Sequence, residues 1–421
     1  MKIGTLVLTL MLMAGGLVQS KEITLDYCRE QAVAHSPLQK KMLYYKTKSE
    51  LENESATTNY YPQLTIEGQA TYQSDVIELK LPIPNAKLPE IPNEQYKVNF
   101  TLKQMIWDGG MTSRRKSIIE SENLAKINEV EISLNSVKDM INDLYFRILF
   151  LQKSVKVLEI NLKQLDTNRY VIESLVRNGV MYRSNLDNIN IQLLHLKQKI
   201  EEVKSNESTL LKILSEWIEE NIDNATALQV PDVQSIEFDE IHRPEYQLFS
   251  EREKLLEANK KYISTKLSPK IFAFGLAGYG APNQFNFFES DGAFYWMAGI
   301  KFQWSPFDWS ATSKRQESID VQKSILAAER EQFDKRINID IIKQREEISK
   351  FEKLIEIDNE IIKRQENIVK EYFSRLKNNT ITITNYLFQV NSLIKTNIDY
   401  ELHKLRKIGA EVNLLTKTGN F

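Results

Sequence analysis

The chain has 421 residues and a formal net charge of -2, from 55 basic and 57 acidic residues. This balance offers no basic surface for phosphate backbones, so nucleic acid is not an expected partner. The single cysteine, Cys28, excludes an intramolecular disulfide and a cysteine-based zinc site. The four histidines are scattered, with no pair at metal-ligand spacing. We therefore expect no metal or other cofactor.

The first 20 residues are typical of a secretory signal peptide. Lys2 precedes an apolar run from Ile3 to Met13, and Val18 and Ser20 occupy positions that signal cleavage accepts. A membrane anchor is the alternative, but spanning a bilayer takes about 20 apolar residues. We expect an exported protein that enters a membrane, if at all, as strands rather than helices.

Two stretches of the first half alternate between apolar and polar residues, as one-sided strands do. They run from Leu64 to Tyr72 and from Tyr96 to Lys103, with a proline-rich segment between them. Proline is poorly tolerated inside a sheet, so that segment is predicted to be a loop. The sequence predicts a β-hairpin over residues 63–103. Residues 296–303 of the second half alternate in the same way and are predicted to form a matching strand. The apolar face of these strands is predicted to include Leu64, Ile66, Val98, Phe100, Ile300 and Phe302.

Two long helices are predicted after this hairpin. From Thr112 to Arg177 apolar residues recur at spacings of 3 and 4, as in a coiled coil. Gly179 can take the left-handed conformation that ends a helix. This apolar stripe, called here the seam, resumes at the same spacing from Leu186 to Trp217, with Glu207 as its only interruption. The short connection predicts an antiparallel helical hairpin over 112–220.

The second half repeats the first. Tyr61-Pro62 recurs as Ser268-Pro269 at an offset of 207, and Asp108, after the second strand, recurs as Asp308. The sequence is therefore predicted to be a tandem duplication. The predicted division is a signal peptide (1–20), a first repeat (21–225) and a second repeat (226–421) with its own helix, β-hairpin (270–305) and helical hairpin (312–415).

The seam of the second long helix is weaker than that of the first. Isoleucines recur every seven residues from Ile341 to Ile362, but Gln344, Asp358 and Gln365 occupy intervening positions. This pattern indicates that one flank of the helix faces water.

Four one-sided strands set a condition on assembly. An open sheet edge would leave unpaired backbone groups in lipid, and bacterial barrels start at about eight strands. One chain therefore cannot close a barrel, and several copies must contribute.

The order of these elements and their duplication resemble the TolC family of outer-membrane efflux ducts. The resemblance covers essentially the whole mature chain. Its local signals are QMIWDGGMTSRR and QWSPFDWSATSKR at the strand-to-helix junctions, and RNGVMYRSNLDNI and KNNTITITNYLFQ at the hairpin tips.

This resemblance implies the α+β fold of an elongated duct. Each protomer of a homotrimer would give four strands to one β-barrel in outer-membrane lipid, and its long coiled-coil hairpins to an α-helical tunnel through the periplasm. The implied role is the passive outer-membrane channel of a tripartite efflux or type I secretion system. It would receive substrates from an inner-membrane transporter and a periplasmic adaptor. Nothing in the chain chooses between drug efflux and protein secretion.

The resemblance also assigns residues to the periplasmic end. The hairpin tips are expected to dock the adaptor through Asn178, Gly179, Val180, Asn378, Asn379 and Thr380. The best-known family member narrows this end with two aspartates, and the matching positions here are Asn385 and Phe388. A polar and aromatic constriction is expected instead of an acidic ring. The alternative is that Asn385 only caps the returning helix.

The polar faces of the strands predict the charge of the barrel lumen. Lys97, Lys103 and Lys301 outnumber Glu67 on these faces, which predicts a positive lumen that favours anions. The alternative is that the lysines lie at the barrel rim, where salt screens them within about 8 Å.

An enzyme is not expected, because the sequence has no phosphate-binding glycine loop, nucleophile elbow or zinc motif. Two other classes compete with the duct: a periplasmic adaptor and a coiled-coil scaffold. An adaptor would normally have one helical hairpin rather than a duplicated pair. A scaffold would have no use for the one-sided strands.

Overall fold

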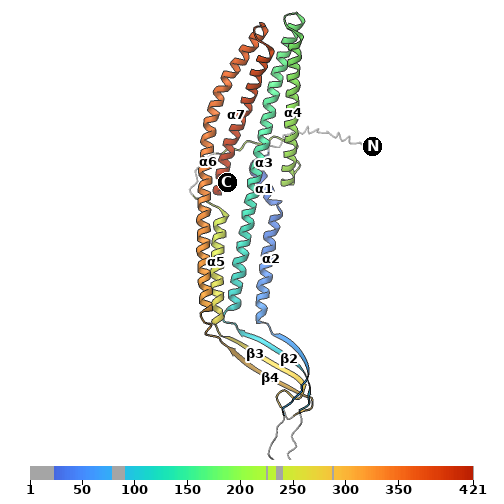
Figure 1. Ribbon diagram of the computed structural model, residues 1–421, viewed down its shortest axis with the longest axis vertical. Coiled ribbons are helices and arrows are strands. Elements are labelled where there is room, and N and C mark those ends of the chain that lie inside the picture. Colours follow the sequence, from blue (N-terminus) through green and yellow to red (C-terminus); the bar gives the residue numbers. More distant parts are fainter. Residues whose placement is uncertain (1–22, 78–90, 224–225, 234–239, 287–288, 421) are drawn as a thin grey trace, which may run out of the picture. The chain divides into compact units, whose positions relative to one another are not determined.

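The computed structural model describes residues 23–77, 91–223, 226–233, 240–286 and 289–420. The expected signal peptide and most of the proline-rich loop lie outside the described residues. The elements, in chain order, are α1 (Leu25–Ala34), α2 (Pro37–Thr57), the short 3-10 helix η1 (Thr58–Tyr60), β1 (Gln63–Tyr72), β2 (Glu94–Trp107), α3 (Met111–Arg177), α4 (Arg183–Ile218), α5 (Pro244–Ser264), the 3-10 helix η2 (Thr265–Leu267), β3 (Lys270–Ala281), β4 (Ala293–Gln303), α6 (Ala311–Lys377) and α7 (Ile383–Thr418) (Figure 1).

The lengths of the helices show the duplication. The helices α2 and α5 each have 21 residues, α3 and α6 each have 67, and α4 and α7 each have 36. Proline opens both 21-residue helices, where its missing N–H leaves no hydrogen bond unmade. The predicted helical hairpins therefore appear in the structure, with ends that differ by a few residues.

The chain forms two compact units, and each takes segments from both halves. The sheet unit consists of Lys40–Ile132 and Arg243–Arg336. The hairpin unit consists of Met1–Gln39, Ser133–His242 and Ile337–Phe421. Both long helices contribute residues to both units.

The sheet unit contains a four-stranded antiparallel sheet in the order β1-β2-β3-β4. Figure 1 shows its labelled strands side by side. The register places Ile66 beside Phe100, Phe100 beside Ala277, and Ala277 beside Trp296, so these residues form a row on one face. The register between β2 and β3 shifts once, between Met105 and Trp107.

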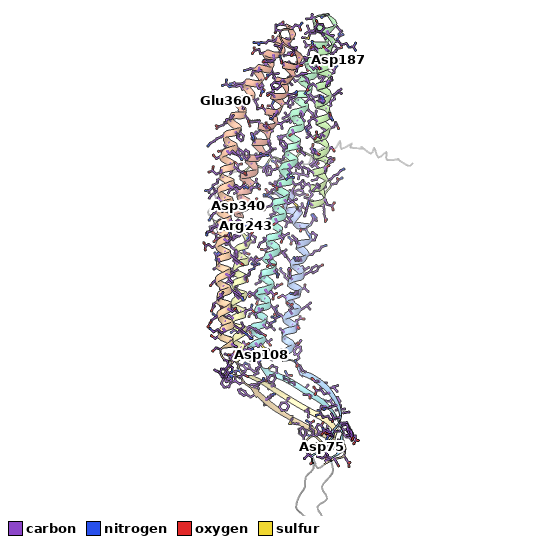
Figure 2. The ribbon with its side chains drawn as sticks, in the orientation of Figure 1. Asp75, Asp108, Asp187, Arg243, Asp340 and Glu360 are labelled. Atoms are coloured by element: carbon purple, nitrogen blue, oxygen red, sulfur yellow. The ribbon has the colours of Figure 1, made fainter. Side chains whose placement is uncertain are left out.

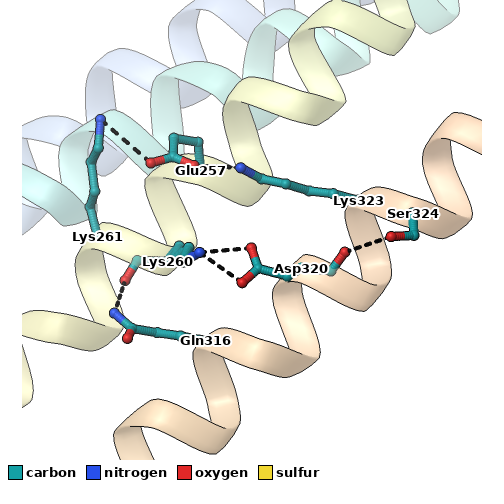
Figure 3. A network of polar contacts seen from close by, with 7 residues as sticks. All are labelled: Glu257, Lys260, Lys261, Gln316, Asp320, Lys323 and Ser324. Carbon is teal, nitrogen blue, oxygen red and sulfur yellow. Dashed lines mark hydrogen bonds and ion pairs between the residues drawn. The ribbon is translucent and has the colours of Figure 1, made fainter.

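Ion pairs join α5 to α6 in the sheet unit (Figure 3). Lys260 Nζ lies 2.7 Å from a carboxylate oxygen of Asp320, and Lys323 Nζ lies 2.5 Å from one of Glu257. Gln316 donates to the carbonyl of Lys260 at 3.4 Å. Such partly exposed pairs contribute about 0–1 kcal/mol each, so they set the pairing of the helices more than their stability.

The hairpin unit has two apolar clusters. The first surrounds Tyr145, whose hydroxyl lies 2.7 Å from the carbonyl oxygen of Ile23 and 2.6 Å from that of Gln229. It ties two extended segments, which meet in a bridge between Ile23 and Leu228, to α3. The second cluster joins all four long helices and includes Leu158, Leu165, Ile172, Val203, Ile394 and Tyr386.

Much of α6 is exposed, including Ile342 and Ile361, but the polar residues that interrupt its seam do not face water. Gln344 and Asp358 are buried, and Asp358 Oδ2 lies 2.6 Å from His403 Nδ1 on α7. Gln365 donates to the hydroxyl of Ser392, which is also on α7. Asp358 and Gln365 therefore make hydrogen-bonded contacts between α6 and α7, whereas the buried Oε1 atom of Gln344 has no hydrogen-bond partner among the described residues. The place of a polar residue in a heptad does not reveal whether it has such a partner.

No helix among the described residues is both long enough and apolar enough to cross a membrane.

Candidate functional site

One face of the sheet, called here the outer face, is apolar and exposed. Leu64 is 64 % exposed, Trp296 is 72 % exposed and Ile300 is 73 % exposed. The register places the predicted apolar residues Leu64, Ile66, Val98, Phe100, Ile300 and Phe302 on this one face, where all six are exposed. A contiguous apolar surface of this kind requires a partner or a lipid environment.

The opposite, inner face carries five of the six charged residues of the strands; the sixth, Glu94 at the start of β2, lies on the outer face. Glu67, Lys97, Lys103 and Lys301 all lie on it, as their positions in the register require. The Lys103 ammonium lies 4.3 Å from the centre of the Phe272 ring. The structure therefore groups the four predicted lumen residues on one face, and their role in conduction stays a prediction.

A buried polar contact crosses the inner face. The Tyr295 hydroxyl donates to Asn99 Oδ1 at 2.7 Å, and both side chains are buried. Gly278 lies between them in the register, and a Cβ atom there would come within 2.4 Å of Asn99 Oδ1. Glycine is needed at this position because the polar contact passes directly over the backbone.

An aspartate caps the start of each long helix. The Asp108 carboxylate, shown in Figure 2 at the junction of β2 and α3, accepts from Gly110 N at 2.9 Å and from Thr112 N at 2.7 Å. The Tyr60 hydroxyl also donates to it, at 2.8 Å. Burial raises the pKa of Asp108, but the hydrogen bonds from Thr112, Tyr60 and Gly110 outweigh burial, so the pKa lies below its usual 3.8.

The same device recurs in the second half. Asp308 accepts from the backbone N–H of Thr312 at 2.9 Å and from its hydroxyl at 2.6 Å. The side-chain hydrogen bond from Thr312 is the main reason that the pKa of Asp308 lies below its usual value. Both aspartates were singled out in the sequence only as markers of the duplication, and their capping of α3 and α6 becomes visible with the backbone geometry.

The two hairpin tips have matching turns. Gly179 has φ +71° and Asn379 has φ +59°, so both take the left-handed conformation. The next residue in each tip donates back to the helix: Val180 N to the Leu175 carbonyl at 2.9 Å, and Thr380 N to the Arg375 carbonyl at 3.0 Å. This pattern satisfies carbonyls that a helix end would leave free. The adjacent tip residues Asn178 and Asn378 are exposed.

The Val180 side chain is 47 % exposed, although its backbone completes the turn. The side chain is therefore available to a partner, while Met181 next to it is buried in the second apolar cluster. None of the six predicted docking residues belongs to an apolar cluster of the hairpin unit.

Asn385 and Phe388 lie in the first turns of α7, and both are exposed. Phe388 is 67 % exposed. The alternative that Asn385 caps this helix is wrong, because Thr382 is the capping residue and its hydroxyl accepts from Asn385 N at 3.3 Å. The Asn385 side chain is therefore not the cap of the helix, and its part in a constriction stays a prediction.

Among the described residues, no group of three or more histidine, cysteine, aspartate or glutamate side chains could hold a metal ion.

No family model matches the chain, and no curated protein matches it in sequence. Solved structures do match. The outer-membrane channel OprN superposes with a TM-score of 0.70 at 13 % identity, covering 94 % of this chain and 90 % of that one. VceC, an outer-membrane protein of Vibrio cholerae, gives a TM-score of 0.65 at 14 % identity, with 94 % and 96 % covered. The Campylobacter jejuni outer-membrane channel CmeC also gives 0.65 at 14 %, with 94 % and 85 % covered.

The chain has the fold of these outer-membrane channels. This confirms the fold that the resemblance to the TolC family implied. Because the sequence identities are 14 % or lower, these structures establish the fold of the chain and not its cargo or partners.

Sequence reasoning missed two features of the sheet unit. The alternation in β3 is poor, so Phe272, Phe274 and Leu276 could not be assigned to a face, and the register now places them on the inner one. The helix α2 has no buried residue, and its exposed side chains include Leu43 and Tyr44. Because this segment is polar on average, its sequence did not indicate that apolar side chains would be exposed on it.

Proposed function

We propose that the protein is a passive, non-enzymatic duct of the outer membrane that serves a tripartite efflux or type I secretion system. The observation that carries this proposal is the four-stranded sheet whose outer face is exposed and largely apolar while its inner face holds all but one of the charged residues of the strands. A water-filled barrel needs this division of faces. A periplasmic adaptor or a coiled-coil scaffold does not.

Closure by further copies of the chain follows from the sheet edges. β1 and β4 are its outermost strands, and unpaired strand edges are not tolerated in lipid. The helices next to these edge strands in the chain, α2 and α6, expose apolar side chains: Leu51 is 61 % exposed and Val321 is 60 % exposed. We propose a homotrimer in which these edges pair and these helix faces are covered.

The remaining partners follow from the tips. In the proposed assembly, the exposed tip residues meet a periplasmic adaptor, which connects the duct to an inner-membrane transporter. The transporter supplies the energy, and the duct supplies a route. Asn385 and Phe388, exposed at the start of α7, would line the narrow periplasmic end.

Adjacent residues of β1 provide the first test. Ile66 lies on the outer face and Thr65 on the inner face, and both are exposed. Ile66→Arg should lower the yield of heat-resistant trimer in outer-membrane fractions, because arginine at mid-membrane costs about 2–4 kcal/mol. Thr65→Arg should assemble normally. Equal assembly of the two variants would show that the outer face does not meet lipid.

The tips provide the second test. Val180→Asp should leave the yield of trimer unchanged, since the turn uses the Val180 backbone, and should reduce export measured as substrate accumulation in cells. Val180→Ile keeps an apolar surface and should export normally. Loss of trimer in the aspartate variant, or normal export by it, would rule out the tip as the docking surface.

A further inference from the structure

The inner face of the sheet is divided into a polar half and an apolar half. On β1 and β2 its residues are mostly polar, with Gln, Thr, Lys and Asn side chains. On β3 and β4 they are largely apolar. The apolar half, called here the inner strip, consists of Phe272, Phe274, Leu276 and Met297.

Most side chains of the inner strip are partly exposed and are therefore accessible to a ligand. The Phe274 ring covers Gly299, since a Cβ atom there would lie 3.0 Å from the ring. Leu276 is directly opposite Met297 on β4, and Met297 is 42 % exposed. Leu276 and Phe274 are half-buried. An apolar ligand could therefore lie along Leu276 and Met297 with the Phe274 ring beside it.

Ammonium groups flank this surface. Lys103 pairs with Phe274 in the register and stacks over Phe272, and Lys301 pairs with Phe272 from the other side. Neither lysine forms an ion pair with any residue that the structure describes. Glu67, on the far strand β1, is the only carboxylate among the inner-face residues of the strands. The strip thus combines apolar area with positive charge that no local anion offsets.

We propose that the inner strip is a binding track for amphipathic organic anions, molecules with an apolar ring system and a carboxylate or sulfonate. The ring would lie on Leu276 and Met297, and the anion would reach Lys103 or Lys301. This inference rests on the proposed duct, whose lumen the inner face would line. Apolar contact and charge act together, so a small hydrophilic anion or an amphipathic cation lacks one of the two attractions.

The test uses the purified full-length protein in planar lipid bilayers, with 2-naphthoate as the probe. Half-maximal reduction of the single-channel current should need at least about tenfold less 2-naphthoate than acetate, since burying one face of the ring on the strip adds roughly one factor of ten. It should also need less 2-naphthoate than 2-naphthylmethylammonium, which has the same ring but a positive charge that the two lysines repel. Lys103→Gln combined with Lys301→Gln should remove the preference over the ammonium compound.

Variants of the strip separate its two attractions. Met297→Ser, at an exposed position, should weaken block by 2-naphthoate severalfold and leave the effect of acetate unchanged. Thr65→Ser, on the polar half of the same face, should change neither. Equal block by the three compounds in the unmodified channel, or block unaffected by Met297→Ser, would overturn the track while leaving the duct standing. Absence of any conductance from assembled protein would overturn both.

Discussion

The two helical hairpins have the same lengths and the same turns, but they are held together by different chemistry. Positions 200 residues apart correspond. Three buried leucines of α3 are replaced on α6 by polar residues, in the pairs Leu144 and Gln344, Leu158 and Asp358, and Leu165 and Gln365. The returning helix α7 also differs from α4 at residues that contact Asp358 and Gln365.

The partners on the returning helices show that these changes are coordinated. His403, which contacts Asp358 at 2.6 Å, stands where α4 has Val203, a member of the apolar cluster with Leu158. The Thr396 hydroxyl donates to Gln365 Oε1 at 3.1 Å and stands where α4 has Leu196. Asp358 and Gln365 thus each have a hydrogen-bond partner on α7, whereas the buried Oε1 atom of Gln344 has none among the described residues.

The comparison shows that one backbone geometry accepts either solution, provided that both partners change together. Burying an apolar pair stabilises by roughly 25 cal/mol per Å² removed from water. A buried hydrogen-bonded pair contributes little net stability, but leaving one member without the other is costly. The α6–α7 hairpin is therefore expected to be held in register by specific contacts, and the α3–α4 hairpin by packing.

Moving one member of the polar pair into the apolar hairpin should have the largest effect. Leu158 is 2 % exposed, so Leu158→Asp would place a carboxylate among apolar side chains. We expect a loss of about 3–5 kcal/mol in the free energy of unfolding, because packing is lost and the charge has no partner. Guanidinium denaturation of the detergent-solubilised protein, followed by circular dichroism of the helices, measures this loss.

The complete pair provides the control. Leu158→Asp with Val203→His should recover about 1–3 kcal/mol of the loss, because the two side chains then interact as at Asp358 and His403. The reverse exchange, Asp358→Leu with His403→Val, should be neutral or should stabilise by about 1–4 kcal/mol. A double variant no more stable than Leu158→Asp alone would mean that the two hairpins do not share the geometry inferred here.

These positions also show what the sequence could and could not reveal. The seam, the hairpin tips and the one-sided strands were predictable, because each rests on a period that repeats over many residues. The polar residues at Gln344, Asp358 and Gln365 were seen but misinterpreted. Their partners lie 27 to 45 residues away along the chain where the structure gives contacts, and no local pattern links them.

The strands of the second half mark a similar limit. Leu64 to Tyr72 could be assigned to faces from alternation, whereas Phe272 and Leu276 could not, because small residues and aromatics occur on both faces of β3. Only the pairing with β2 and β4 assigns them. The buried contact between Asn99 and Tyr295 depends on the same pairing.

A smaller effect is expected at the junctions between strand and long helix, where the two halves also differ. Asp108 is fully buried and accepts hydrogen bonds from Tyr60 as well as from the helix, whereas Asp308 is partly exposed and depends on Thr312. Asp108→Ala should cost about 1–2 kcal/mol, as loss of a helix cap does. Asp308→Ala should cost less. Denaturation midpoints of the two variants at pH 7 test this order.

The pH dependence of that loss identifies its cause. Since the pKa of Asp108 in the folded protein lies below its usual 3.8, its carboxylate contributes stability that is present above the unfolded pKa. That contribution disappears as the pH falls through the lower, folded-state pKa. The gap in denaturation midpoint between the unmodified protein and Asp108→Asn should therefore narrow on acidification below about pH 4. A gap that stays constant down to pH 2 would show that Asp108 acts through packing alone, and that the two junctions differ in shape rather than in electrostatics.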